Sequence, residues 1–133
     1  MPFINVKIAG PTLAIEQICR LQRGLTDLIS EAFHQEREST SVLVEQVPTG
    51  KWSIAGDIEP VLAHVTATVN AASHAADNKA RFIAEAHQLL KLILGDGLPS
   101  ATYVVVNELP DDSWGYGGIT LEHRAKSAHL GTA

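Results

Sequence analysis

A repeat within the chain is the feature that most restricts its fold. An apolar residue, a proline, three residues, a tryptophan, three residues and a glycine occur at Val47–Gly56 and again, sixty-two residues later, at Leu109–Gly118. Each copy follows a short run of apolar, mostly β-branched residues, Val42–Val44 in the first half and Val104–Val106 in the second, which is typical of a buried strand. The two halves therefore share one structural plan.

A predicted helix precedes the strand in the first half. Apolar residues recur at spacings of three and four over Ile18–Ala32, which predicts a helix that starts near Thr12 or Leu13. Ahead of this helix, Phe3–Ile8 alternates apolar and polar residues in the manner of a strand. The first half is thus a β-α-β unit.

The second half repeats this order. The helical periodicity runs over Ala80–Leu94, with Ser73 or Asp77 as N-cap candidates, and the glycine-containing segment Gly95–Gly97 ends it. A β-branched-rich segment, Leu62–Val69, precedes it as a strand. The second half is therefore also β-α-β.

The fold class that follows is α/β, more narrowly α+β: a tandem β-α-β repeat in one four-stranded mixed sheet with two helices on one face. Strands that flank one helix pair in parallel, because a parallel pair needs a crossover connection. Residues 1–133 are predicted to form a single domain with pseudo-repeats at about 2–58 and 62–120, joined at 57–61, and a mobile C-terminal tail at 121–133. We expect the uncovered face of the sheet to be apolar and to be buried in a homo-oligomer.

Composition and charge exclude several classes of function. The net charge is -5 and no cluster of lysine or arginine is present, which argues against binding to nucleic acid. No apolar run approaches the roughly 20 residues of a membrane-spanning helix. Cys19 is the single cysteine, so we expect no internal disulfide and a cytoplasmic location. The six histidines lack close ligand spacing except His123 and His129 in the tail, and we expect neither metal nor cofactor.

The N-terminal Pro2 is the candidate catalytic residue. Removal of Met1 would leave a secondary amine at the start of a packed strand. An α-amino group titrates at about pH 7.7–8.0, and partial burial lowers this value, so the amine can act as a general base at neutral pH. A proline at this position also simply permits removal of Met1, so position alone leaves both interpretations open.

The order of elements resembles the tautomerase superfamily, the family of 4-oxalocrotonate tautomerase. Pro2 opens a β-α-β unit, and the segment Asn107–Gly118 is similar to the second strand and hairpin of the family. The doubled unit resembles its fused chains, among them cis-3-chloroacrylic acid dehalogenase and malonate semialdehyde decarboxylase. The resemblance implies the tautomerase/MIF-like fold, a homotrimer, and Pro2 as a proton carrier acting on a small enol or keto acid.

The sequence departs from the family where the substrate carboxylate would be bound. The resemblance implies arginines at positions that here hold Thr12 and Leu43, or, in the fused dehalogenases, Asn70 and about Ser73. The glutamate that activates water in those dehalogenases corresponds to Tyr116. Addition of water is therefore poorly supported, whereas Tyr116 could donate a hydrogen bond to an enolate.

Other side chains are candidates for binding the substrate. The candidate replacement cations are Lys7, Lys51, His64, His74 and Arg124. Each has an ordinary structural alternative, such as a solvated lysine or a core histidine. Trp52 and Trp114 either pack between subunits or form a wall of the proline pocket, as the corresponding aromatic residue does in the family.

The function expected from the sequence is that of a tautomerase-like isomerase acting on a small carbonyl or enol compound. A cofactor-free decarboxylase, hydratase or dehalogenase of the same superfamily is the alternative enzyme. An oligomeric binding module with a decayed active site is the alternative without catalysis, and the missing arginines favour it.

Overall fold

The computed structural model of the chain describes the backbone of residues 2–71 and 74–131 and side chains as far as Ser127. The elements in chain order are β1 (Phe3–Ala9), α1 (Ile15–Phe33), β2 (Ser41–Val47), β3 (Leu62–Asn70), α2 (Ala76–Leu94), β4 (Tyr103–Leu109), β5 (Gly115–Tyr116), β6 (Ile119–Thr120) and α3 (Leu121–Gly131). The predicted tandem β-α-β plan is confirmed.

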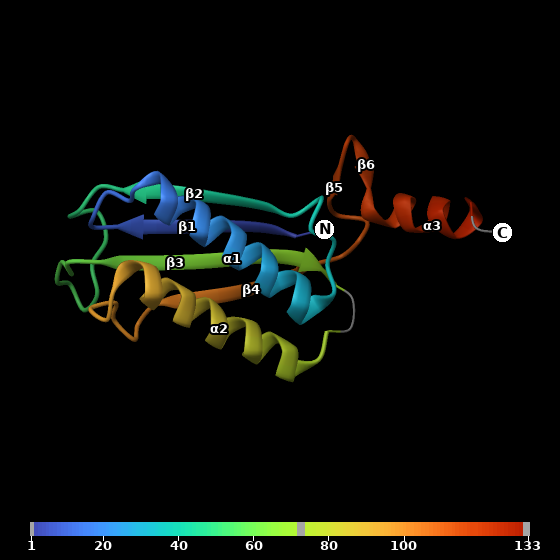
Figure 1. Ribbon diagram of the computed structural model, residues 1–133. Helices are drawn as coiled ribbons and strands as arrows, with labels where there is room; N and C mark the ends of the chain where they lie inside the picture. Colours follow the sequence, from blue (N-terminus) through green and yellow to red (C-terminus); the bar gives the residue numbers. More distant parts are fainter. Residues whose placement is uncertain (1, 72–73, 132–133) are drawn as a thin grey trace.

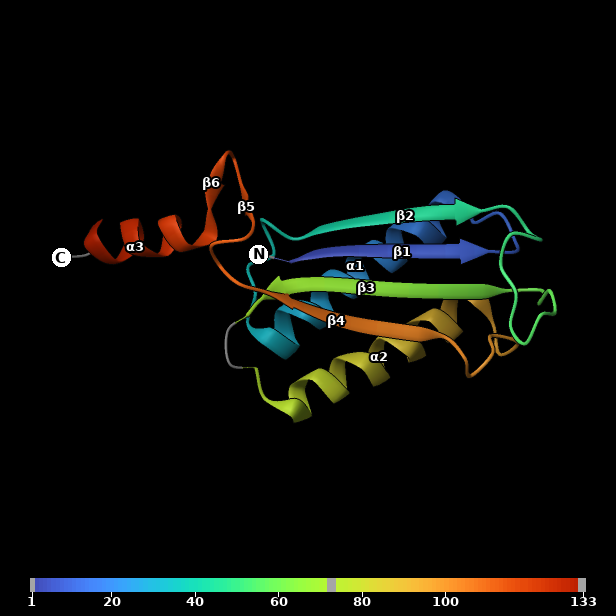
Figure 2. The same ribbon diagram turned by 180° about the vertical axis from the view of Figure 1, so that it is seen from behind.

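One four-stranded sheet joins the two repeats in the order β2-β1-β3-β4. The strands within each repeat are parallel, β1 with β2 and β3 with β4. The central pair, β1 and β3, is antiparallel, with Val6 opposite Val65. Both α1 and α2 cover the same face of this sheet (Figure 1), and the view from behind shows the other face without helices (Figure 2).

The core lies between the sheet and the two helices. Side chains alternate along β1, so that Ile4, Val6 and Ile8 are buried while Lys7 faces the opposite side. The core also contains buried residues of β3 and of both helices, among them Val65, Ala67, Leu21, Leu25, Ile29, Phe82, Ala86 and Leu90. The sheet is therefore held in place by burial of one face only.

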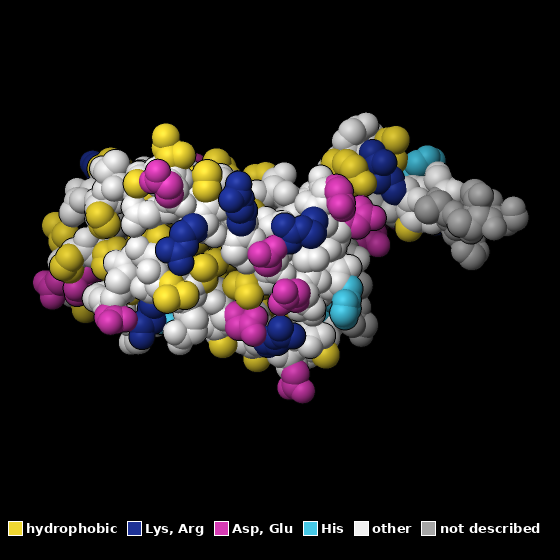
Figure 3. All heavy atoms as spheres, viewed as in Figure 1, with side chains coloured by type: hydrophobic (Ala, Val, Ile, Leu, Met, Phe, Trp, Pro, Cys, Tyr) yellow, Lys and Arg dark blue, Asp and Glu magenta, His cyan; other side chains and the backbone are white. Residues whose placement is uncertain are grey.

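The two helices also contact each other. A Cβ atom at Gly24 of α1 would lie 2.6 Å from the Leu89 Cδ2 atom of α2, so glycine permits their close approach. On the outer surface, Arg81 bonds Glu85 within α2 and reaches Glu31 of α1 at 3.6 Å. Charged side chains of both signs lie over the helices (Figure 3). This surface is typical of a solvated helical face.

Two predicted helix starts differ from the structure. The helix α1 begins at Ile15 with Ala14 as N-cap, not at Thr12 or Leu13, and the Ala14 amide donates to the Gln17 side chain. The N-cap of α2 is Ala75, so Asp77 lies inside the first turn, where its charge is favourable. Ser73, the other cap candidate, lies outside the described residues. The predicted glycine end is confirmed, because Gly95 has a φ of 101° and its amide donates to the Lys91 carbonyl.

The uncovered face of the sheet is more polar than predicted. Large apolar side chains are present, with Phe3 45%, Leu43 44% and Val105 40% exposed. Polar side chains lie between them, and the Asn5 amide of β1 donates to the Glu45 carboxylate of β2 at 3.0 Å. The face is therefore a mosaic of apolar and polar side chains and is less apolar than expected.

The segment predicted as a C-terminal tail is helical for most of its length. Residues Leu121–Gly131 form α3, which follows the β5–β6 hairpin directly. Figure 1 shows the hairpin and α3 projecting beyond the end of the sheet. Because apolar residues recur only weakly at helical spacing in this segment, the sequence did not predict a helix there. Across 2–71 and 74–131, none of the helices combines the length and apolarity needed to cross a bilayer.

Two leucines of one helix test the location of the core. Leu90 is completely buried and Leu92 is 72% exposed. We expect Leu90→Ala to lower the free energy of unfolding by about 2–5 kcal/mol, because it leaves a cavity. The control, Leu92→Ala, should change it by less than about 0.5 kcal/mol. Urea denaturation measures both, and equal losses in the two variants would contradict this packing.

Candidate functional site

Pro2 is held at one end of the sheet. It immediately precedes β1, and its side chain is fully buried. Its carbonyl oxygen accepts a hydrogen bond of 3.1 Å from the Ser41 amide at the start of β2. The parallel pairing of β1 and β2 continues from this point, with Phe3 opposite Ser41. The backbone at Pro2 is thus part of the sheet rather than a loose end.

The sheet topology brings the end of the second repeat to Pro2. Because β1 and β3 are antiparallel, Phe3 lies opposite Thr68 near the end of β3. Because β3 and β4 are parallel, Asn70 pairs with Leu109 at the same end, and the Ala71 amide donates to the Leu109 carbonyl at 2.7 Å. The hairpin that follows Leu109 therefore leaves the sheet beside Pro2 (Figure 1).

The hairpin is fastened to the start of α3 by backbone hydrogen bonds. The Leu121 amide donates to the Trp114 carbonyl at 3.1 Å, and the Glu122 amide donates to the Asp111 carbonyl at 3.0 Å. In the helix, the His123 amide is capped by the Thr120 hydroxyl at 3.1 Å. The segment from Asp111 to the first turn of α3 is therefore one connected unit.

Arg124 of α3 folds back onto this hairpin. Its Nη2 atom donates to the Tyr116 carbonyl at 2.8 Å, and its guanidinium carbon lies 3.9 Å from the centroid of the Tyr116 ring. This is a cation–π contact, which the planar guanidinium of arginine favours. The Arg124 Nε atom is buried and has no hydrogen-bond partner. One donor of the guanidinium is therefore without a partner in the described structure.

Unpaired polar atoms gather at the Pro2 end of the molecule. In the described part of the chain, the buried side-chain atoms that lack a partner are Ser39 Oγ, Asn70 Oδ1, His74 Nε2, Asp111 Oδ1, Trp114 Nε1 and Arg124 Nε. All belong to segments that meet at this end: before β2, at or after the last residue of β3, and after β4. Buried polar groups without partners are costly, so a bound molecule, water or another protein surface is needed to pair them.

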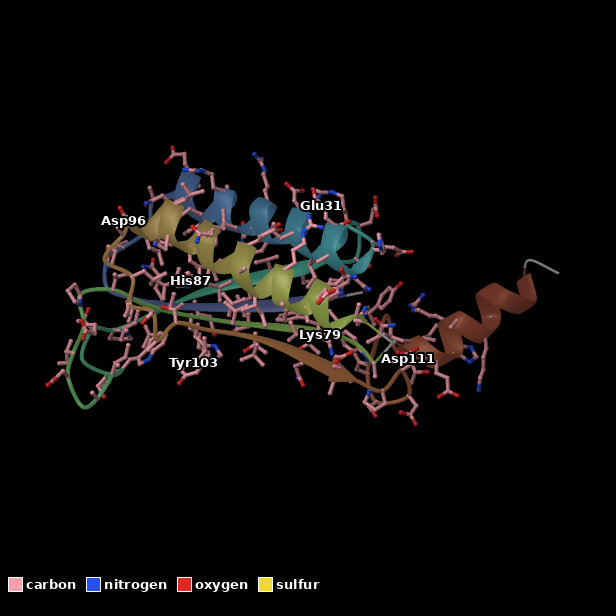
Figure 4. All side chains as sticks on the ribbon, turned by 90° about the horizontal axis from the view of Figure 1, so that it is seen from below. Glu31, Lys79, His87, Asp96, Tyr103 and Asp111 are labelled. Atoms are coloured by element: carbon pink, nitrogen blue, oxygen red, sulfur yellow. The ribbon has the colours of Figure 1, made fainter. Side chains whose placement is uncertain are left out.

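Two further side chains at this end, Lys79 and His74, already have partners within the protomer. Lys79 in the first turn of α2 forms an ion pair with Glu108 of β4 at 2.7 Å. Figure 4 shows Lys79 and Asp111 at the same end of the molecule. The His74 ring lies 4.7 Å from the Phe33 ring, a contact of two tilted rings. His74 is therefore fixed by packing, while Lys79 is engaged by a carboxylate.

The other candidate residues lie at the far end of the sheet. His64 is near the start of β3, opposite Lys7 of β1 and Tyr103 of β4. Trp52 and Lys51 lie in the connection after β2, beside these residues. Figure 4 shows Tyr103 far from Asp111. Within one protomer these four candidates, Lys7, Lys51, Trp52 and His64, therefore cannot contact a ligand at Pro2.

Sequence reasoning did not select Ser39 and Asp111, whose buried oxygens belong to this site. Asp111 could have been found, because it follows Pro110 in the repeated hairpin pattern. Ser39 lies in an irregular connection and carries no comparable signal. Across the described residues, no group of three histidine, cysteine, aspartate or glutamate side chains could hold a metal ion.

Comparison with known sequences identifies relatives of each half. The profile of the family described as Tautomerase enzyme matches residues 2–58 and 65–124. "Probable tautomerase K2" of Dickeya dadantii is 32% identical over 57 residues, which are 43% of this chain and 85% of that protein. A probable tautomerase of Campylobacter jejuni is 36% identical over 47 residues, 35% of this chain and 69% of that protein. Relatives of this kind correspond to a single repeat.

Comparison with solved structures identifies the doubled fold. Native fused 4-OT has a TM-score of 0.79 at 20% identity and covers 92% of this chain and 98% of its own. A fused 4-OT solved as an asymmetric trimer has a TM-score of 0.77 at 23% identity over 90% and 98% of the two chains. Pt0534, solved after inactivation by 2-oxo-3-pentynoate, has a TM-score of 0.80 at 17% identity over 91% and 98%. The predicted fold is confirmed.

Two neighbouring glycines test the attachment of Arg124 to the hairpin. Gly117 and Gly118 both have positive φ, so alanine at either should cost roughly 1–2 kcal/mol in the backbone. A Cβ atom at Gly117 would lie 2.8 Å from Arg124 Nη2, whereas one at Gly118 would contact nothing within 4 Å. We expect only Gly117→Ala to move the Arg124 Nε–H signal in the NMR spectrum, because it displaces the guanidinium from the Tyr116 ring. An equal shift in Gly118→Ala would contradict the contact.

Proposed function

Because the chain belongs to the tautomerase enzyme family, we propose that it interconverts the keto and enol forms of a small carbonyl compound with Pro2 as the proton carrier. Removal of Met1 frees the secondary amine of Pro2. The observation that carries the proposal is the gathering of unpaired buried polar atoms around the end of the sheet that holds Pro2.

The chemistry requires an amine that is neutral and oriented. Burial disfavours the charged form of an amine and lowers its pKa, so a larger fraction can accept a proton at neutral pH. The pyrrolidine ring and the hydrogen bond from Ser41 to the Pro2 carbonyl restrict rotation of the nitrogen. A nitrogen held in this way meets the substrate in one orientation.

The reaction moves one proton and consumes no other reactant. The Pro2 nitrogen takes a proton from the carbon beside the carbonyl group, which leaves an enolate, and the protonated amine returns a proton to the enolate oxygen. Reversal of these steps converts enol to ketone. Trp114 Nε1 and Arg124 Nε are unpaired donors that can stabilise the negative oxygen. In this proposal Asn70, His74, Trp114, Tyr116 and Arg124 border the substrate.

Arg124 is the proposed replacement for the missing arginines. In the described structure Arg124 forms no ion pair, whereas Lys79, another cation at this end, is paired with Glu108. If its guanidinium binds a carboxylate of the substrate, displacement by Gly117→Ala raises KM more than the Gly118→Ala control does. The same KM in both variants would remove Arg124 from the site.

We also propose that three chains assemble through the part of the uncovered sheet faces that holds Phe3, Leu43 and Val105, with the Lys7 and His64 end of the sheet outside the contact. Fused 4-OT relatives form trimers, and Phe3, Leu43 and Val105 offer apolar area on this face. Sedimentation equilibrium should give three times the chain mass of 14.3 kDa. We expect Leu43→Glu to reduce this mass, because it buries a charge in the interface, and Ile15→Glu, at an exposed position of α1, to leave it unchanged. A single-chain mass for the unmodified protein would contradict the proposal.

The central test replaces Pro2. We expect Pro2→Ala to lower kcat/KM for phenylpyruvate tautomerisation at least about a hundredfold, because the primary amine of alanine rotates freely and loses its orientation. Absorbance of the enol measures the rate. Mass spectrometry of both proteins verifies that Met1 has been removed, and an unchanged urea midpoint verifies that the fold is intact.

A chemical probe provides a second readout. An amine adds to the activated triple bond of 2-oxo-3-pentynoate, the compound that inactivates the related Pt0534. The expected product is a single adduct on the N-terminal peptide with parallel loss of activity. Full activity of Pro2→Ala, retention of Met1 in the active protein, or inactivation through another residue would each overturn the role of Pro2.

A further inference from the structure

We propose that the end of the sheet opposite Pro2 is a second binding site, which takes a small carboxylate with an apolar or aromatic body. A cavity of about 310 Å³ lies there, bordered by Lys7, Val47, Lys51, Trp52 and His64. Lys7 is five residues beyond Pro2 in β1, which is about 16 Å along a strand at about 3.3 Å per residue. The cavity is therefore separate from the proposed catalytic site of the same protomer.

Three strands and one connection build this cavity. Lys7 near the end of β1 lies opposite His64 of β3, and Val47 ends β2. The connection after β2 adds Lys51 and Trp52 and turns back through two hydrogen bonds of 2.9 Å between Ile54 and Asp57. The backbone on both sides of the cavity is therefore fixed by pairing.

The cavity carries positive charge in an acidic protein. None of the five residues that border it is acidic, and in the described structure neither lysine forms an ion pair with a carboxylate. The nearest carboxylate in register with Lys7 is Glu45, which accepts a hydrogen bond from Asn5 instead. Two ammonium groups are thus available to an anion, although the chain as a whole has a net charge of -5.

The other side chains that border the cavity favour a ligand with an apolar or aromatic group. Trp52 and Val47 are half-buried and form an apolar wall, and the His64 ring lies 6.5 Å from the Tyr103 ring. A flat apolar group can pack against the Trp52 indole while its carboxylate meets the lysines. This combination favours a small aromatic carboxylate over inorganic phosphate.

The repeat explains why this site binds without proton transfer. Phe3 pairs with Ser41 in the first repeat and His64 pairs with Tyr103 in the second, so His64 corresponds to Phe3 and the preceding Ala63 corresponds to Pro2. Ala63 is bonded into the chain on both sides and has no free amine. The lysines have no counterparts at the Pro2 end, because Lys51 corresponds to Ser113 and Lys7 to Thr68.

The test uses the Trp52 indole as a reporter in the full-length protein. The Nε1–H signal of Trp52 is assigned by its loss in Trp52→Phe and is followed by NMR during titration with phenylacetate. We expect it to shift to saturation. The double substitution Lys7→Met and Lys51→Met should raise the dissociation constant at least about tenfold, because two charged donors are removed. The matched control is Lys91→Met in α2, on the helical face of the sheet, which should leave it unchanged.

Three results of the phenylacetate titrations would overturn the proposal. They are a Trp52 signal that does not move, a shift confined to Trp114, and equal weakening in Lys91→Met and the double variant. The variant Pro2→Ala distinguishes failure of this proposal from failure of the proposed catalytic function. Phenylacetate should bind this variant with unchanged affinity whether or not Pro2 carries protons. Inorganic phosphate, titrated in the same way, should bind more weakly, since it offers nothing to the Trp52 wall. Equal or tighter phosphate binding would contradict the assigned ligand class.

Discussion

The antiparallel pairing of β1 with β3 is the contact on which the rest of the molecule depends. It joins two β-α-β units that each leave a strand edge open, and it places both helices over one continuous apolar surface centred on Val6 and Val65. The same pairing sets which parts of the chain meet. The start of the first repeat lies beside the end of the second, so an N-terminal residue and a hairpin more than a hundred positions later share one location.

The periodicity of the sequence predicts most of the fold. Which residues meet at the site depends mainly on how the strands pair. The alternation of Ile4, Val6 and Ile8 predicts a strand with one buried face, and the glycine after Leu94 predicts the end of a helix, because both signals are local. The start of α1 at Ile15 was missed because its N-cap is an alanine, which has no side-chain oxygen to mark the position. The separation of Trp52 and His64 from Pro2 follows from strand order, which no local signal encodes.

The two ends of the sheet carry different chemical groups. One end has a proline that can carry a free amine, a hairpin fastened to α3, and unpaired donors and acceptors. The other has a hairpin closed by the single pair Ile54 and Asp57, two lysines without an ion pair in the described structure, and an internal alanine in place of the proline. Fusion of the repeats makes this possible, because a substitution in one half is no longer copied into the other.

If Met1 is removed, as the proposed function requires, the hydrogen bond from the Ser41 amide to the Pro2 carbonyl limits when that removal can occur. Once β2 has paired with β1, the backbone beside the Met1–Pro2 bond belongs to the sheet and the proline ring is buried. An aminopeptidase must reach that bond in an extended chain. Synthesis proceeds at about 5–20 residues per second, so only a few seconds separate the appearance of Pro2 from that of Ser41. Under the proposed function, excision of Met1 would therefore compete kinetically with formation of the first parallel strand pair on the ribosome.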